Sequence, residues 1–252
     1  MASTFTDYRT ISRNLPRALA ATAKAPDVAT QTKYFQAHIG EVKSAADLMK
    51  NFRLLSYALT AFGLQDMAGS RALIRKVLEG GAADPKSFAN TMNDARFREF
   101  ARAFDFRTHG AATTRRAEAT AAVVEKFTRQ TLETRAGATN EGVRLALYFE
   151  RKAPSIADAY DILADKALLE VTRVALGLPA AMSQQNIDVQ AKTLAKKIDF
   201  AEFRDPAKVQ RFVQRYAAMA DMTGAQGPTG AAGVGLGLDL LRSLQGLRLG
   251  GM

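Results

Sequence analysis

Histidine is the residue type in this chain best suited to metal binding or acid–base catalysis, and it occurs twice, as His38 and His109. Two imidazoles that share a metal on one helix stand three or four positions apart, whereas these two are far apart in the sequence. The chain has no cysteine, which excludes disulfides, thiolate metal sites and a cysteine nucleophile. We therefore expect no metal site and no cofactor, with His38 at a helix end or on the surface and His109 in a connecting loop.

Motifs for nucleotide binding and for hydrolysis are also missing from the sequence. The glycine-rich "GVGLGL" near the C-terminus follows no predicted strand, and the chain ends before the acidic residue that a dinucleotide site needs. The phosphate-loop, zinc-protease and serine-hydrolase motifs do not occur. Glu150, next to Arg151 and Lys152, is more simply a surface ion cluster than a catalytic carboxylate. We predict that the protein is not an enzyme.

A group of arginines between residues 96 and 116 is the best candidate site for an anion or a nucleic acid. Phe97, Phe100 and Phe104 lie among them at helical spacing and could stack on bases. The same spacing is more typical of a buried helix face, which would leave the arginines at its rim. The candidate residues are Arg96, Arg98, Arg102, Arg107, Arg115 and Arg116.

The net charge of +10 is spread along the chain, which argues against a dedicated nucleic-acid surface. Residues 1–110 carry 16 Lys+Arg against 10 Asp+Glu, and residues 111–252 carry 19 against 15. Residues 221–252 hold two Asp and two Arg, so there is no polybasic tail. A nucleic-acid partner is therefore not favoured, and a basic nucleic-acid-binding or regulatory protein is kept as the alternative function.

The elements that would position these residues are all predicted to be helices. Hydrophobic residues make up 47% of the chain and recur at helical spacing almost throughout, and no strand or hairpin pattern is convincing. Two pairs of residues have the form of capping boxes, Ser44 with Asp47 and Ser155 with Asp158. Asp84–Pro85 predicts a further helix start. No stretch approaches the apolar length of a membrane span, and the N-terminus lacks the pattern of a cleavable signal peptide.

Sequence features recur at a fixed distance, which indicates an internal repeat. Gly63–Leu64 and Gly177–Leu178 lie 114 positions apart, and each pair has the form of a left-handed Gly cap followed by an apolar residue. The two capping boxes, 111 positions apart, are out of step with this offset. The offset of 114 also relates Tyr34–Phe35 to Tyr148–Phe149, Leu54–Leu55 to Leu168–Leu169 and Asp47 to Asp161, and an offset of 112 relates Phe97, Phe100 and Phe104 to Val209, Phe212 and Tyr216.

We therefore predict an all-α fold made of two pseudo-repeated helical halves with a flexible Gly-rich C-terminal tail. The first half covers residues 1–110 and the second covers 111–222, and the two are expected to pack as one compact body joined near Phe106–Thr114. The tail, residues 223–252, combines a Gly-rich linker with a short helix. The apolar face of that helix suits docking on the protein's own body or on a partner. The candidate partner-binding residues are Leu240, Leu241, Leu244 and Leu247.

Several segments resemble one bacterial family and occur in that family's order. They are "YRTISRNLPRAL", "KYFQAHIGEVKSAADLM", "LLSYALTAFGLQDM", "KVLEGG" followed by "DPKSFAN", and "LYFERKAPSI" followed by "ILADKALLEV". From about Tyr8 to Met219 the chain resembles the family catalogued as domain of unknown function twelve-seventeen. Members of that family are typically encoded among flagellar genes, and no catalytic residues are established for them.

The resemblance implies a non-enzymatic role in flagellar assembly, structure or regulation, exercised through protein–protein interaction. The expected partners are flagellar proteins, and the expected location is cytoplasmic or flagellum-associated. The Gly-rich tail lies outside the resembling segments, so its docking role is inferred from its own apolar face.

Overall fold

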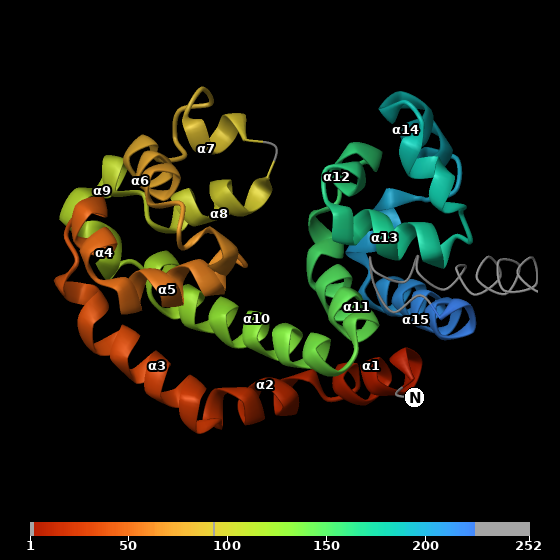
Figure 1. Cartoon of the computed structure of the whole chain (residues 1–252), viewed down its shortest axis with the longest axis horizontal. Coiled ribbons are helices and arrows are strands. Elements are labelled where there is room, and N and C mark those ends of the chain that lie inside the picture. Colours follow the sequence, from red (N-terminus) through yellow and green to blue (C-terminus); the bar gives the residue numbers. More distant parts are fainter. Residues whose placement is uncertain (1–2, 93, 225–252) are drawn as a thin grey trace, which may run out of the picture. The chain divides into compact units, whose positions relative to one another are not determined.

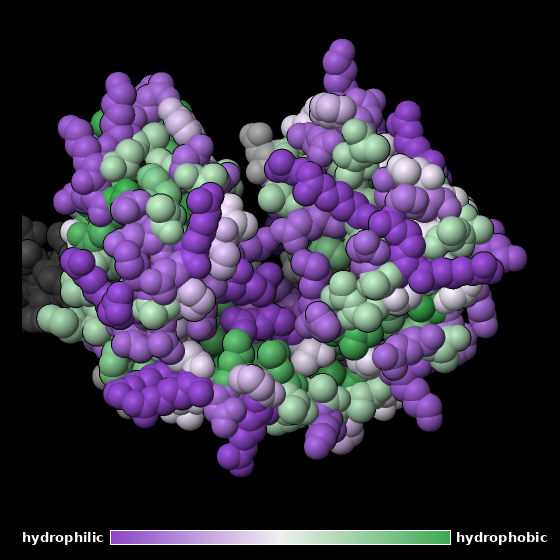
Figure 2. All heavy atoms as spheres, turned by 180° about the vertical axis from the view of Figure 1, so that it is seen from behind, coloured by the Kyte–Doolittle hydropathy of each residue, from purple (hydrophilic) through white to green (hydrophobic). Residues whose placement is uncertain are grey.

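The computed structural model describes residues 3–92 and 94–224, which are mostly helical (Figure 1). No strand occurs among these residues, which confirms the all-α prediction. On the face drawn in Figure 2, hydrophilic side chains are interspersed with smaller hydrophobic patches, while most large apolar residues are buried in the core. Within the described ranges, no helix is long and apolar enough to cross a membrane. The predicted tail lies outside the described residues apart from Thr223 and Gly224.

The chain is divided into two compact units, each with its own internal packing. The middle unit is Ile11–Arg135, and the terminal unit combines Met1–Thr10 with Ala136–Met252. The division falls inside α10 (Ala121–Thr139), whereas the sequence-based halves divide at residue 110. A continuous helix can change its packing partners without any break in its sequence, so no turn signal marks this point. The expectation that the two halves pack as one body stays a prediction.

The middle unit is built around buried aromatic side chains. Phe35 stacks on Tyr57, and Tyr57 stacks on Phe127, with ring centroids 4.4 and 3.8 Å apart. Phe100 and Phe104 contact each other and are fully buried, as their helical spacing predicted. The elements are α2 (Leu15–Lys24), α3 (Pro26–His38), η1 (Ile39–Glu41), α4 (Ala45–Lys50), α5 (Phe52–Ala61), η2 (Gln65–Met67), α6 (Arg71–Gly80), α7 (Phe88–Thr91), α8 (Ala95–Ala103), α9 (Phe106–His109), η3 (Gly110–Arg115), η4 (Ala117–Ala119) and most of α10.

One helix start predicted in this unit is wrong. The carboxylate of Asp84 accepts a hydrogen bond from the Lys86 N–H at 2.8 Å, and the Ser87 N–H donates to the Asp84 carbonyl at 2.9 Å. These bonds form a turn, and α7 begins only after Ser87. Aspartate side chains favour such local turns as well as helix caps, so the sequence pattern was ambiguous.

The terminal unit packs α11 (Glu141–Lys152), α13 (Lys166–Ala175) and α15 (Pro206–Thr223) against one another and includes the start of the chain. Phe149, Phe203 and Phe212 form an aromatic cluster with ring centroids between 5.1 and 5.4 Å apart. Asp221, near the end of the last helix, accepts hydrogen bonds from two backbone N–H groups at the start of the first helix. The elements are α1 (Thr4–Ser12, entering the middle unit at its end), the end of α10, α11 (Glu141–Lys152), η5 (Ala153–Ser155), α12 (Ala159–Leu163), α13 (Lys166–Ala175), η6 (Ala180–Gln184), α14 (Ile187–Ala195), η7 (Phe200–Arg204) and α15 (Pro206–Thr223).

The run of elements from α3 to α6 in the middle unit recurs from α11 to α14 in the terminal unit, as the predicted internal repeat requires. In the middle unit η1 and α5 lie 114 positions before η5 and α13 of the terminal unit, and each pair has the same length. Gly63 and Gly177 follow α5 and α13 with φ angles of 69° and 63°. In both places the N–H of the next leucine donates to the carbonyl five residues earlier, at 2.8 and 2.9 Å. This helix end requires a positive φ, so both predicted glycine caps are confirmed.

The N-caps follow the same offset once one predicted cap is corrected. Ser44 caps α4 by accepting from the Asp47 N–H, and the Asp47 carboxylate reaches back to the Lys43 N–H, one residue before the N–H that a standard capping box uses. The cap of α12 is Asp158, not the predicted Ser155, and Asp161 makes the return bond. Ser155 donates to a carbonyl of the preceding turn instead. The offset of 114 therefore relates Ser44 to Asp158 and Asp47 to Asp161. The 111-position spacing of the two predicted capping boxes arose from the wrong cap at Ser155.

Candidate binding site

The structure places the six candidate arginines on α8, α9, η3 and the segment after it. Three of them form hydrogen bonds or ion pairs with other groups. Arg96 donates to both carboxylate oxygens of Asp94 and to a backbone carbonyl. Arg107 donates to a backbone carbonyl at 3.3 Å, and Arg116 pairs with a carboxylate at 3.1 Å. The role of this set in binding an anion or a nucleic acid stays a prediction. The other three, Arg98, Arg102 and Arg115, are half-buried or exposed.

The remaining sequence candidates are the tail leucines and the two histidines. Leu240, Leu241, Leu244 and Leu247 lie outside the described residues, so their docking role stays a prediction. His109 is half-buried at the end of α9, in the region predicted to be a connector. Over residues 3–92 and 94–224, no group of three acidic, histidine or cysteine residues could hold a metal ion. His38 ends α3, as predicted, and lines a hollow in the surface.

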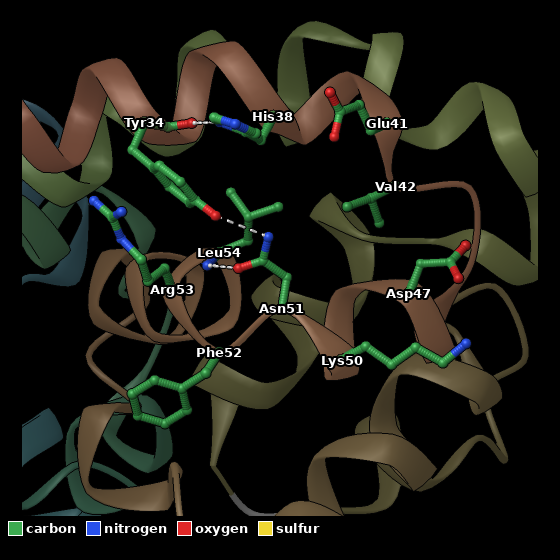
Figure 3. A pocket seen from close by; sticks show the side chains of 10 residues that line it. All are labelled: Tyr34, His38, Glu41, Val42, Asp47, Lys50, Asn51, Phe52, Arg53 and Leu54. Carbon is green, nitrogen blue, oxygen red and sulfur yellow. Dashed lines mark hydrogen bonds between the residues drawn. The ribbon is translucent and has the colours of Figure 1, made fainter.

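That hollow, of about 550 Å³, is open to solvent and lies on the middle unit between α3, η1, α4 and the start of α5 (Figure 3). An adjoining hollow of about 190 Å³ shares Tyr34, Phe52 and Arg53 with it. We call the two together the Tyr34 hollow. The larger part is lined by Tyr34, His38, Glu41, Val42, Asp47, Lys50, Asn51, Phe52, Arg53 and Leu54, and the smaller part also by Gln31, Ser56 and Tyr57.

The ring of Tyr34 is held between two other side chains. Arg53 Cζ lies 3.6 Å from the centre of the Tyr34 ring, and the His38 ring is stacked on it with centroids 4.2 Å apart. Two groups this close cannot share one face, so they cover opposite faces, and Figure 3 shows the ring between them. His38 Nδ1 also donates to the Tyr34 carbonyl at 2.9 Å, because a carbonyl can only accept. The three side chains therefore form one ordered stack.

The hydroxyl of Tyr34 accepts a hydrogen bond from Nδ2 of Asn51 at 3.2 Å (Figure 3). Asn51 is also the N-cap of α5, where its Oδ1 accepts from the Leu54 N–H at 3.1 Å. This second bond fixes the orientation of the amide, so the Tyr34 oxygen must be the acceptor. In the described part of the chain, no acceptor is bonded to the hydroxyl hydrogen of Tyr34, which is free to donate to a ligand.

The first two residues of α5 provide an exposed aromatic ring and an exposed guanidinium to the hollow. Phe52 is 62% exposed. Arg53 is exposed, and no described residue forms a hydrogen bond or an ion pair with its guanidinium. A hydrogen bond from Ser44 lowers the pKa of Asp47, so this carboxylate is charged but already bonded. Burial raises the pKa of Tyr57 to about 12, which keeps its hydroxyl neutral. These groups are suited to binding carboxylates and apolar side chains.

The terminal unit repeats the frame of this site without its exposed groups. Tyr148, the counterpart of Tyr34, donates its hydroxyl hydrogen to Oδ2 of Asp165 at 2.6 Å. Asp165 caps α13 in the way that Asn51 caps α5, so a tyrosine bonded to the helix cap is common to both units. At the positions matching His38, Phe52 and Arg53, the terminal unit has Lys152, Lys166 and Ala167.

The sequence analysis missed the Tyr34 hollow, although the repeat contained a signal for it. Aligning the halves at an offset of 114 shows that Phe52–Arg53 is replaced by Lys166–Ala167 at the start of an otherwise matching helix. An exposed phenylalanine is not required by the core there, so the difference marks a possible binding group. Periodicity cannot show that Arg53 reaches Tyr34 across the packed helices α3 and α5.

Comparisons with known proteins connect the chain to one family and one solved structure. Residues 61–209 match the family described as "Protein of unknown function (DUF1217)". The X-ray crystal structure of Protein AGR_C_984 from Agrobacterium tumefaciens is similar to this structure, with a TM-score of 0.81 and 44% sequence identity. The similarity covers 88% of this chain and 96% of that chain. No curated protein matches the chain.

Proposed function

This chain belongs to the family described as Protein of unknown function (DUF1217), and from that premise we propose a non-enzymatic role in flagellar assembly, structure or regulation. The protein acts by protein–protein interaction. The flagellar context comes from the resemblance of its segments to a family whose members are typically encoded among flagellar genes. The mode of action comes from the surface of the middle unit.

The observation that carries the interaction is the exposed Phe52–Arg53 pair in the Tyr34 hollow. Burying an aromatic side chain as large as Phe52 in a partner contributes to binding through the hydrophobic effect. Aromatic residues and arginine are enriched at protein interfaces and dominate their binding energy. His38 stacks on Tyr34 and bonds its carbonyl, so it helps to hold the Tyr34 ring in place at the hollow.

A motility assay with a matched control tests this function. In the bacterium that encodes the protein, we expect Phe52→Lys combined with Arg53→Ala to reduce spreading in soft agar toward the level of a gene deletion. Lys166→Ala, at the position in α13 that matches Phe52, should leave spreading unchanged. Normal spreading after gene deletion would reject the flagellar role. A spreading defect in the gene deletion but not in the double variant would reject the hollow as the interaction surface.

The C-terminal leucine stripe is the second proposed docking element. Its apolar face, Leu240 to Leu247, is proposed to dock on a partner. We expect deletion of residues 224–252 to weaken motility and co-purification of the partner. If both survive unchanged, the tail is not a docking element, and the proposal then depends on the Tyr34 hollow alone.

A further inference from the structure

We propose that the Tyr34 hollow binds an acidic segment of a partner protein that also presents an apolar side chain. This inference rests on the proposed function, because it names the chemistry of the partner for the same surface. Arg53 and Tyr34 donate hydrogen bonds to a carboxylate of the segment, and Phe52 packs against its apolar side chain. The partner is a peptide segment rather than a nucleic acid.

Arg53 is prepared for a carboxylate by its contact with Tyr34. Its guanidinium lies 3.6 Å from the Tyr34 ring centre, which restricts the motion of a side chain that is otherwise flexible. An arginine that stacks on an aromatic face keeps its N–H groups available, because they lie in the plane of the guanidinium. Among the described residues no acceptor is bonded to them. A planar fork of free donors matches the two oxygens of a carboxylate.

The Tyr34 hydroxyl adds a second donor at the same place. Because Tyr34 accepts from Asn51, its own hydrogen can point to a ligand. In the terminal unit the matching hydrogen is committed to the carboxylate of Asp165. With Asn51 at the cap in place of an aspartate, the tyrosine hydroxyl keeps its hydrogen available for a ligand. This difference between two copies of the same frame is the reason to assign ligand binding to the middle unit.

The charge of the middle unit complements an acidic partner. Residues 11–135 carry 20 Lys+Arg against 12 Asp+Glu, so this unit has a net charge of +8 out of +10 for the whole chain. Lys50 adds an exposed cation to the hollow itself, and Asp47 is already bonded to Ser44. A field of this sign speeds encounter with acidic segments.

Two observations favour a peptide over a nucleic acid. Both faces of the Tyr34 ring are covered, by Arg53 and His38, so this ring cannot stack on a base. Glu41 is also exposed at the hollow, and it would oppose carboxylates and phosphates alike, so it does not distinguish the two kinds of partner. The exposed apolar surface of Phe52 instead suits an aliphatic or aromatic side chain of a protein segment.

A random peptide library displayed on phage tests the proposal with the full-length protein. Peptides are selected on the wild-type protein and counter-selected on the Phe52→Lys, Arg53→Ala double variant. These substitutions introduce the residue types that start the matching helix α13, so the helix start should be preserved. Circular dichroism and thermal melting check that the variant remains folded.

We expect the selected peptides to be rich in Asp and Glu beside Leu, Ile or Phe. Their affinity should fall about tenfold or more with Arg53→Ala, since a charge-assisted bond is lost. Tyr34→Phe, which removes the second donor, should weaken binding less than Arg53→Ala. Lys166→Ala should leave affinity unchanged.

Each contrary result identifies what has failed. If the selected peptides depend on Phe52 and Arg53 but are not acidic, the acidic partner is wrong while the hollow remains an interaction surface. If no peptide distinguishes the wild-type protein from the double variant, the hollow is not a peptide site. A single-stranded DNA probe bound by the wild type and lost in the double variant would overturn the proposal in favour of nucleic acid. Acidic-peptide binding combined with normal motility in the gene deletion would reject the flagellar role alone.

Discussion

At the scale of single residues, Gly63 and Gly177 determine how α5 and α13 end. Both have positive φ angles, 69° and 63°, a conformation in which a Cβ atom is strained. In each helix end the glycine N–H donates to the carbonyl three residues earlier, at 3.0 and 3.1 Å, and the next leucine closes the cap. The two glycines are therefore explained by backbone geometry, and neither needs a ligand.

Replacing either glycine by alanine should destabilise the protein. A Cβ at Gly177 would meet nothing within 4 Å, and at Gly63 its nearest contact would be an ordinary 3.6 Å, so the cost comes from φ. We expect Gly63→Ala and Gly177→Ala each to lower the free energy of unfolding by about 1 kcal/mol or more. Urea denaturation measures this, and Gly40→Ala, with open space and no positive φ, is the control. Equal stability of all three variants would contradict the cap assignment.

At the scale of elements, short helices depend on their caps more than on their length. The helix α12 has five residues, and Asp158 accepts from the N–H groups of Tyr160 and Asp161 at its start. A carboxylate at a helix N-terminus also interacts favourably with the helix dipole. Asp161 then bonds the backbone just before the cap, as Asp47 does in α4. The cap therefore sets where this helix begins.

Removing the cap of α12 should cost more than removing the serine first expected to be that cap. We expect Asp158→Ala to reduce the free energy of unfolding by about 1 kcal/mol. Ser155→Ala should change it much less, because Ser155 is exposed and bonds only a carbonyl of the preceding turn. Chemical denaturation of both variants measures the difference. A larger effect of Ser155→Ala would restore Ser155 as the cap.

Local patterns predicted the helices, the buried phenylalanine face of α8 and the glycine caps, because each depends on residues within a few positions. The wrong helix start at Asp84 and the wrong cap at Ser155 arose where two local hydrogen-bond patterns compete for one short polar side chain. The Tyr34 hollow could not be predicted by such patterns, since it needs α3 packed on α5 and one Arg53 rotamer. The division inside α10 was missed because packing partners change there without a helix break.

At the scale of the whole molecule, the first and last described helices belong to one unit. Asp221 accepts from Ser3 Oγ and from the Thr4 N–H, each at 2.8 Å, and Thr4 is completely buried. Thr4 also bonds Asn140, the N-cap of α11, 136 positions later. A Cβ at Gly142 would lie 2.8 Å from the Thr4 side chain, so glycine leaves the room that this contact needs. The terminal unit is therefore completed by residues from the start of the chain, which bond to α15 and to the N-cap of α11.

The contact between the start of the chain and Asp221 of α15 should weaken at acid pH. Partial desolvation opposes ionisation of Asp221, but hydrogen bonds from Phe5, Ser3 and Thr4 outweigh it and lower its pKa. A lowered folded-state pKa means that the stabilisation is present above the ordinary value of about 3.9 and is lost as pH falls through the folded value. Thermal melts should therefore show Asp221→Asn less stable than the wild type at neutral pH, with the difference shrinking below about pH 4. The control is Asp66→Asn, at an exposed carboxyl for which the structure shows no bond, and it should show no such trend. If the stability difference between Asp221→Asn and the wild type does not change with pH, the charge of the Asp221 carboxylate does not hold the start of the chain in place.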